Sequence, residues 1–274
     1  MEIFSIFALI NCIGALFISM LVFIENRHSV SNKLFTLFGL TISIWSFGYW
    51  RWLIVDFGYP ETAFFWIKFF TIGSMLLPGV YLHWVLNLVQ SWKWQRVAIR
   101  LFYSISAIFI AIAIILPSLF IKSVSMYEPF LYWPQSGVLY SVYIFVYFTA
   151  VFLTLILLVK NYRITSDKER QKQYFFIILG TIIGFGGGVT NFFLWYSIPF
   201  LPYGNVLVVI GLSFLGYAAV KYHLFNLKLI LAELLTFAIW IVVLTQAIIA
   251  DTFNGKLLWG GTLVFAVVLG IFLI

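Results

Sequence analysis

The sequence predicts an all-α fold, a polytopic transmembrane helix bundle of about nine spans with the N-terminus outside and the C-terminus in the cytoplasm. Hydrophobic residues make up 64% of the chain and charged residues 9%, whereas a soluble domain carries roughly 25% charged residues. The apolar residues form long unbroken blocks, which favours helices over the alternating ~10-residue strands of a barrel. The basic residues gather in alternate loops, and this pattern sets the orientation.

Each predicted span is near the ~20 residues that a helix needs to cross the ~30 Å hydrocarbon core. The segments are 3–24, 33–55, 64–90, 99–121, 138–160, 174–198, 205–225, 229–250 and 257–274. The first begins without a basic run, so we expect a retained helix rather than a cleaved signal peptide. The last ends on Gly270–Ile274 without a polar anchor, so we expect the natural chain to continue.

Most of the basic residues belong to one set of alternate loops, which we assign to the cytoplasm. These residues are Arg27, Lys33, Lys93, Arg96, Arg100, Lys160, Arg163, Lys168, Arg170, Lys172, Lys221 and Lys228. The net charge of +7 therefore indicates a multi-pass protein of the cell (inner, cytoplasmic) membrane with membrane lipid as its surroundings. No nucleic-acid partner is expected, because the charges are scattered over loops.

Two basic residues lie at membrane depth near the outer side, Arg51 and Lys68. One interpretation is that both reach outward and pair with Asp56 and Glu61. The other is a pocket open to the outside that binds an amphipathic or anionic small ligand. Its predicted residues are Trp45, Tyr49, Arg51, Trp66, Lys68, Asn191 and Trp195.

Small residues and one proline predict how the helices pack. The sixth segment has Gly180, Gly184 and Gly188 at four-residue spacing with Gly186 and Gly187 beside them, which predicts close helix contact and, less strongly, a hinge. In the third segment, Pro78 predicts a kink.

Other polar and aromatic residues predict structure rather than chemistry. We expect His83 to make an interhelical hydrogen bond and Glu233 to pair with a nearby lysine. The loop 122–137 is rich in aromatic residues and predicts an interfacial belt or a lid over the pocket. The chain lacks phosphate-binding, hydrolase and zinc motifs, so no catalytic residue, metal or cofactor is expected and the chain itself is not expected to be an enzyme.

Several local patterns occur in a characteristic order. They are Trp45-Ser46-Phe47-Gly48-Tyr49, Phe65-Trp66-Ile67-Lys68 with Gly73 and Pro78, Asn161-Tyr162-Arg163, Glu169-Arg170-Gln171, Asn191, and Ala218-Ala219-Val220-Lys221-Tyr222-His223-Leu224-Phe225-Asn226. With these patterns, residues ~30–226 resemble the N-terminal seven-helix sensor region of prokaryotic membrane histidine kinases. Two departures are His223 in place of the usual Arg and Glu233 where a basic residue is common.

The resemblance implies a seven-helix membrane sensor domain in residues 1–226, followed by two additional transmembrane helices in 227–274 that lead to a cytoplasmic output region. It also implies a homodimer and a kinase or output domain in cis or in trans, since no dimerisation helix, phosphoacceptor histidine or ATP-binding domain is in this chain. The expected function is a sensory input module of a two-component histidine kinase, which detects an extracellular or intramembrane small ligand or the state of the membrane and transmits helix movement to a cytoplasmic output. The alternative is a small multipass transporter or channel, and a membrane enzyme ranks third because it would need clustered acids, histidines or cysteines.

Overall fold

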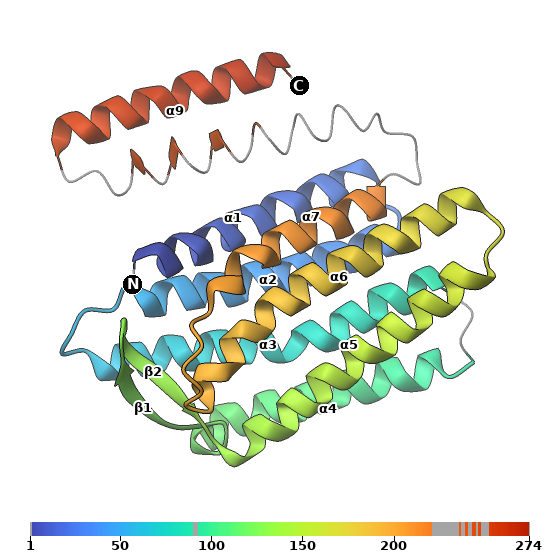
Figure 1. The fold of residues 1–274 in the computed structure, drawn as a ribbon, viewed down its shortest axis with the longest axis horizontal. Helices are drawn as coiled ribbons and strands as arrows, with labels where there is room; N and C mark the ends of the chain where they lie inside the picture. Colours follow the sequence, from blue (N-terminus) through green and yellow to red (C-terminus); the bar gives the residue numbers. More distant parts are fainter. Residues whose placement is uncertain are drawn as a thin grey trace. The chain divides into compact units, whose positions relative to one another are not determined.

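The computed structural model describes residues 2–89, 93–220, 236, 239–240, 243–244, 246–247 and 252–273. The chain divides into two units, Met1–Tyr222 and His223–Ile274. The first contains seven long helices among its described residues (Figure 1). They are α1 (Glu2–Glu25), α2 (Val30–Leu53), α3 (Pro60–Val89), α4 (Gln95–Ile115), α5 (Val138–Ile164), α6 (Lys168–Trp195) and α7 (Val206–Val220).

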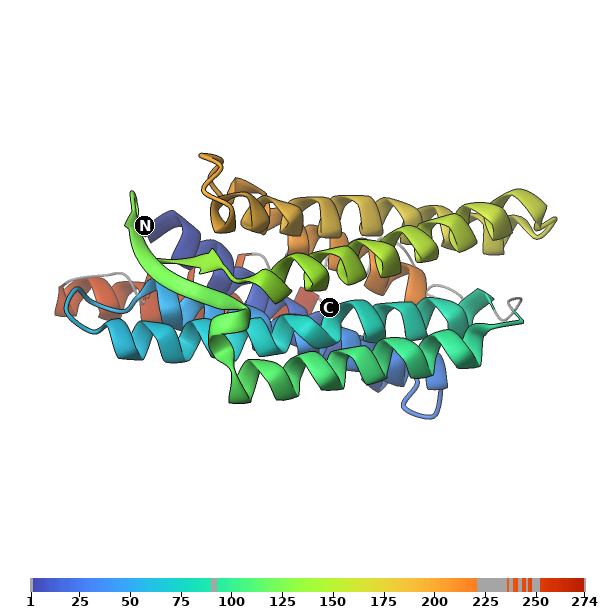
Figure 2. The ribbon, with the colours of Figure 1, turned by 90° about the horizontal axis from the view of Figure 1, so that it is seen from below.

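The helices of the first unit run alongside one another as a bundle (Figures 1 and 2). Helix α1 packs on α2 and α7, α3 packs on α2, α4 and α5, and α6 packs on α5 and α7. Helix α4 contacts the bundle mainly through α3 and leaves apolar side chains such as Ile108 and Ile114 exposed. Exposed apolar side chains on a helix of this composition are suited to lipid.

Six described helices are long and apolar enough to cross a membrane, namely α1, α3, α4, α5, α6 and Tyr203–Val220, which contains α7. Helix α2 has 24 residues but falls short in hydropathy because it carries several polar side chains. Four of them, Asn32, Thr41, Ser43 and Ser46, are buried inside the bundle. A buried polar face lowers the mean hydropathy of a helix without exposing polar groups to lipid.

The segment between α4 and α5 contains a β-hairpin that the sequence analysis did not predict. Strand β1 (Ile121–Tyr127) pairs antiparallel with β2 (Phe130–Ser136), after a 3₁₀ turn η1 (Pro117–Leu119). The predicted span 99–121 is wrong at its end, because α4 stops at Ile115, two residues before a proline. The expected all-α fold therefore carries one small two-stranded sheet among the described residues.

The hairpin is fixed to one end of the bundle, which we call the hairpin end. The indole nitrogen of Trp52 donates to the Tyr132 carbonyl at 2.7 Å, and the Tyr132 hydroxyl accepts from the backbone nitrogen of Gly58 at 2.8 Å. The ring of Phe130 lies 5.1 Å from that of Phe4, so the start of α1 is at the same end. Figure 2 shows the hairpin crossing this end of the helices.

The opposite end of the bundle, which we call the basic end, carries most of the charge. Its described basic residues are Arg27, Lys33, Lys93, Arg96, Arg100, Lys160, Arg163, Lys168, Arg170 and Lys172. The hairpin end and its neighbouring turns carry Arg51, Lys68 and Lys122. Loops that are far apart in the sequence therefore gather at the two ends of the bundle, and the basic end carries more positive side chains than the hairpin end.

The second unit is described mainly through α9 (Phe253–Leu273), which overlaps the predicted last span. Within this unit the indole nitrogen of Trp240 donates to the Ala266 carbonyl at 2.8 Å. The predicted span 229–250 lies almost wholly outside the described residues, as do Glu233 and the exit pattern from Lys221 onward.

Candidate functional site

A cavity lies between five helices of the first unit, α2, α3, α5, α6 and α7. The centres of water-sized molecules can occupy about 70 Å³ of it. Because a site for one water needs roughly 10–15 Å³ on this measure, the cavity has room for several waters or one small molecule. Its position at the meeting point of the helices makes it the best candidate for a ligand site in the described part of the chain.

The cavity walls are aromatic and carry no charge. Ten of the 21 lining residues are aromatic: Phe38, Trp45, Tyr49, Phe70, Tyr140, Tyr143, Tyr147, Phe185, Phe192 and Trp195. Among the described residues, none that lines the cavity is ionised at neutral pH. The walls therefore favour an uncharged occupant, because an unpaired charge is costly to bury.

Four of the residues predicted for the pocket lie in this lining, Trp45, Tyr49, Asn191 and Trp195. They come from α2 and α6, which are far apart in the sequence. The ring of Trp195 stacks on Tyr140 with centroids 4.0 Å apart. The structure thus brings these four residues to one cavity, together with tyrosines of α5 that the sequence analysis did not single out.

The other three predicted pocket residues, Arg51, Trp66 and Lys68, lie away from the cavity lining. The Arg51 guanidinium lies 5.3 Å from the Trp66 ring centroid, and the Lys68 ammonium lies 5.2 Å from that of Phe64. Such cation–π contacts hold a cation over the face of an aromatic ring without burying it in a pocket. The basic character expected for the pocket is therefore not found in the cavity.

The expected ion pairs of Arg51 and Lys68 are also corrected by the structure. The ion pairs between described side chains join Arg170 to Asp167 and Lys172 to Glu169, and neither includes Asp56 or Glu61. Both cations lie over aromatic rings of α2 and α3 instead. The tryptophan and phenylalanine residues near both cations in the sequence were the signal for these cation–π contacts.

Three tyrosine hydroxyls in the lining have no hydrogen-bond partner among the described residues. Tyr49, Tyr140 and Tyr147 are 2%, 3% and 6% exposed, respectively. The Tyr49 hydroxyl is fully buried near Asn205 but forms no hydrogen bond of acceptable geometry. The Tyr49 hydroxyl is closed off even from water-sized molecules. Buried polar groups are nearly always hydrogen-bonded, so the Tyr140 and Tyr147 hydroxyls are the ones available to a molecule inside the cavity.

A proline in α3 shapes the cavity wall. Pro78 has no N–H, so the carbonyl of Ser74 one turn earlier loses its intrahelical donor. The Tyr143 hydroxyl of α5 donates to that carbonyl at 3.0 Å. Both Ser74 and Tyr143 line the cavity, and the helix continues through the proline to Val89. The hydrogen bond therefore ties α5 to α3 where α3 lacks one of its own bonds.

Three buried asparagines tie α1, α6 and α7 together at the hairpin end. The Asn191 amide donates to the Asn205 side-chain oxygen at 2.5 Å, and the Asn205 amide donates back at 3.2 Å. Asn11 donates to the Asn205 carbonyl at 2.7 Å and accepts from the Val209 backbone nitrogen at 3.1 Å. Interhelical amide bonds of this kind fix helices in lipid. The sequence analysis did not single out Asn11, although an asparagine inside an apolar helix indicates an interhelical hydrogen bond.

The predicted glycines have three different surroundings. An added Cβ on Gly180 would lie 2.7 Å from the Gly211 carbonyl oxygen, and one on Gly187 would lie 2.3 Å from that of Gly204. At Gly184 the Gly211 Cα would be 3.4 Å away. We call these contacts of α6 with α7, and with the 3₁₀ turn Tyr203–Asn205 just before it, the glycine seam. Only residues without a side chain permit this backbone approach.

The remaining two glycines of the triplet lie outside the seam. A Cβ on Gly188 would meet the Tyr147 hydroxyl at 3.8 Å and Val208 at 3.9 Å, which are ordinary contacts, and Gly188 lines the cavity. A Cβ on Gly186 would meet nothing within 4 Å. Helix α6 is continuous from Lys168 to Trp195. The predicted hinge stays a prediction.

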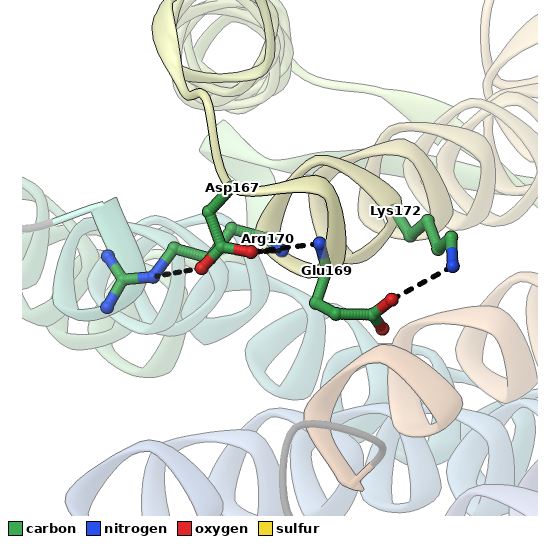
Figure 3. A network of polar contacts seen from close by, with 4 residues as sticks. All are labelled: Asp167, Glu169, Arg170 and Lys172. Atoms are coloured by element: carbon green, nitrogen blue, oxygen red, sulfur yellow. Dashed lines mark hydrogen bonds and ion pairs between the residues drawn. The ribbon is translucent and has the colours of Figure 1, made fainter.

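At the basic end, α6 begins with a charged turn (Figure 3). The Asp167 carboxylate caps the helix by accepting from the backbone nitrogens of Glu169 at 2.9 Å and Arg170 at 3.3 Å. The Lys172 ammonium lies 2.9 Å from the Glu169 carboxylate. One turn further, the Gln173 amide donates to the Ala218 carbonyl at 2.9 Å, which links the start of α6 to the last turn of α7.

The expected interhelical bond of His83 is confirmed. Its Nδ1 lies 3.2 Å from the Tyr103 hydroxyl, which joins α3 to α4. Among the residues that the structure describes, no group of three His, Cys, Asp or Glu side chains is placed to hold a metal ion. His83 therefore links α3 to α4.

The comparisons with known proteins agree with this architecture. No curated protein matches the chain. Residues 7–228 match the family described as the N-terminal 7TM region of histidine kinase. This match covers most of the chain and includes every helix that lines the cavity. The chain is therefore a multi-pass membrane protein that belongs to the family of N-terminal seven-transmembrane regions of histidine kinases.

Proposed function

We propose that the chain is the sensory input module of a two-component histidine kinase in the cytoplasmic membrane. Its seven-helix region crosses the membrane seven times, with the hairpin end outside and the basic end in the cytoplasm. The uneven charge of the two ends supports this orientation, because cytoplasmic loops carry an excess of Lys and Arg. Residues 227–274 add two more spans, and the output region follows in cis or as a separate partner.

The cavity is the proposed input, and one observation carries this proposal. Gly180 and Gly184 line the cavity and also lie in the glycine seam with α7. An occupant of the cavity therefore presses on the same part of α6 that is closely packed against α7. Because α7 is the last helix of the first unit before the chain continues, its displacement would pass to the output region. The proposed signal is a small ligand, and the proposed active form is a homodimer.

The proposal is tested with a fusion that places residues 1–274 before the cytoplasmic region of a well-characterised histidine kinase. Gly188→Leu fills the cavity, whereas Gly186→Leu adds the same side chain to the same helix where no atom lies within 4 Å. We expect Gly188→Leu to change autophosphorylation in proteoliposomes severalfold and Gly186→Leu to leave it unchanged. Equal activity of all three proteins, at equal membrane insertion, would contradict a sensory role for the cavity.

A further inference from the structure

We infer that the cavity binds a small uncharged molecule that combines a flat apolar ring with a hydrogen-bonding oxygen. This inference rests on the proposed function, in which the cavity receives the signal. It replaces the anionic ligand that the positions of Arg51 and Lys68 in the sequence suggested. Three properties of the lining carry it, namely its charge, its free hydroxyls and its aromatic walls.

The first property is the absence of charge in the described lining. Neither Arg51 nor Lys68 reaches the cavity, since each lies against an aromatic ring on another side of α2 or α3. A carboxylate or ammonium group in the cavity would have no described side chain of opposite charge to pair with. Burying such a group without a partner costs far more than burying a neutral one.

The second property is a pair of tyrosine hydroxyls that have no hydrogen-bond partner among the described residues. Tyr140 and Tyr147 lie about two turns apart on α5. Each hydroxyl can donate one hydrogen bond and accept others. A carbonyl or hydroxyl oxygen on the ligand would accept from one of these tyrosines and so remove the cost of an unpaired buried group. A pure hydrocarbon would leave both hydroxyls unpaired.

The third property is the shape of the walls. Trp195 stacks on Tyr140 with an interplanar angle of 8°. Trp45 lies against Tyr49 with ring centroids 5.5 Å apart. Aromatic faces and edges in this arrangement offer stacked and edge-on contacts to a further ring. The limited volume favours a molecule of one or two rings over a long lipid chain.

The test uses three matched probes that share one brominated ring: neutral 4-bromophenol, anionic 4-bromobenzoate and cationic 4-bromobenzylamine. Bromine quenches tryptophan fluorescence, and Trp45 and Trp195 line the cavity. The whole 274-residue chain is placed in phosphatidylcholine nanodiscs at neutral pH. We expect saturable quenching by 4-bromophenol, with affinity for the two charged probes lower by more than about tenfold.

Matched variants separate the cavity from quenching by probe dissolved in lipid. Gly188→Leu should abolish the saturable quenching and Gly186→Leu should keep it. Tyr147→Phe removes one free hydroxyl without changing the packing and should weaken 4-bromophenol binding severalfold. Binding of a charged probe as tight as that of 4-bromophenol would overturn the inference. Unchanged 4-bromophenol binding to a Gly188→Leu protein that elutes like the wild type in gel filtration would overturn it as well.

The binding result is independent of the kinase fusion. If Gly188→Leu alters autophosphorylation but 4-bromophenol does not bind saturably, the ligand class is wrong and the sensory role stands. If 4-bromophenol binds with the expected selectivity but the variants leave autophosphorylation unchanged, the cavity is a site for neutral rings and the proposed function fails.

Discussion

Helix α6 packs against α7 and against α5 through different kinds of residue. Against α7 it presents glycines, and the backbones approach so closely that a Cβ on Gly211 would lie 2.4 Å from the Gly184 backbone. Against α5 it presents Phe185, Phe192 and Trp195, whose rings contact those of Tyr140 and Tyr147 beside the cavity. Protein interiors resist compression where they are close-packed. We therefore expect α6 and α7 to move together, with any displacement taken up between this pair and α5.

The largest expected effect comes from breaking the glycine seam. Gly211→Leu places a side chain against the Gly184 backbone, where the obstacle is main chain and cannot move aside by rotating. We expect a loss of about 3 kcal/mol or more in stability, measured as thermal unfolding of the purified protein in detergent. Gly186→Leu is the control and should unfold at the wild-type temperature. Equal stability of the two variants would mean that the seam is not close-packed.

The asparagine cluster should give the next largest effect. Asn191→Ala leaves the Asn205 side chain without both of its bonds to residue 191. We expect a cost of about 2 kcal/mol, because buried polar groups without partners are unfavourable. Thermal unfolding measures it, and Thr149→Ala, which removes an exposed hydroxyl bonded to its own helix, serves as the control. An effect of Asn191→Ala no larger than that of the control would show that these amides do not hold α6 and α7 together.

The hydrogen bonds of the Tyr132 hydroxyl hold the hairpin to the bundle, and we call them the hairpin latch. Removing them should have a smaller and local effect. Tyr132→Phe removes the hydroxyl that accepts from Gly58 and Tyr59 and donates to the Asp56 carbonyl. These bonds are exposed, so water replaces them and the expected cost is about 1 kcal/mol. Hydrogen exchange should rise in the hairpin and in the loop 54–59 and stay unchanged in α6 and α7. Faster exchange throughout α6 would place the latch in the same cooperative unit as the seam.

The smallest effect is expected at the charged turn of α6. The Lys172 and Glu169 side chains of the ion pair are 61% and 64% exposed, respectively. Exposed pairs of this kind contribute little because water screens them. Lys172→Ala should leave the unfolding temperature unchanged. Gln173→Leu, which breaks the hydrogen bond to the Ala218 carbonyl, should lower the unfolding temperature measurably. A larger drop in unfolding temperature for Lys172→Ala than for Gln173→Leu would mean that the ion pair, rather than the hydrogen bond to α7, stabilises the start of α6.

Hydropathy and charge were sufficient to predict the helical bundle and the places of its helices, because both properties are local. The hairpin was missed because a short aromatic strand pair next to an apolar block gives a weak signal in a membrane protein. At the site, four of the predicted residues, Trp45, Tyr49, Asn191 and Trp195, line one cavity, whereas Arg51 and Lys68 lie against aromatic rings outside its lining. The depth of a residue along a helix can be read from the sequence, but the rotation of α2 and α3 about their axes depends on packing that a single sequence does not state.

The central claim is that α6 and α7 move as one body relative to α5. Spin labels at the exposed positions Phe152 on α5, Ile182 on α6 and Ile210 on α7, in a Cys12→Ser background, report both distances. Filling the cavity by Gly188→Leu should change the distance between positions 152 and 182 and leave that between 182 and 210 unchanged. A change in the distance between 182 and 210 with a constant distance between 152 and 182 would contradict the account.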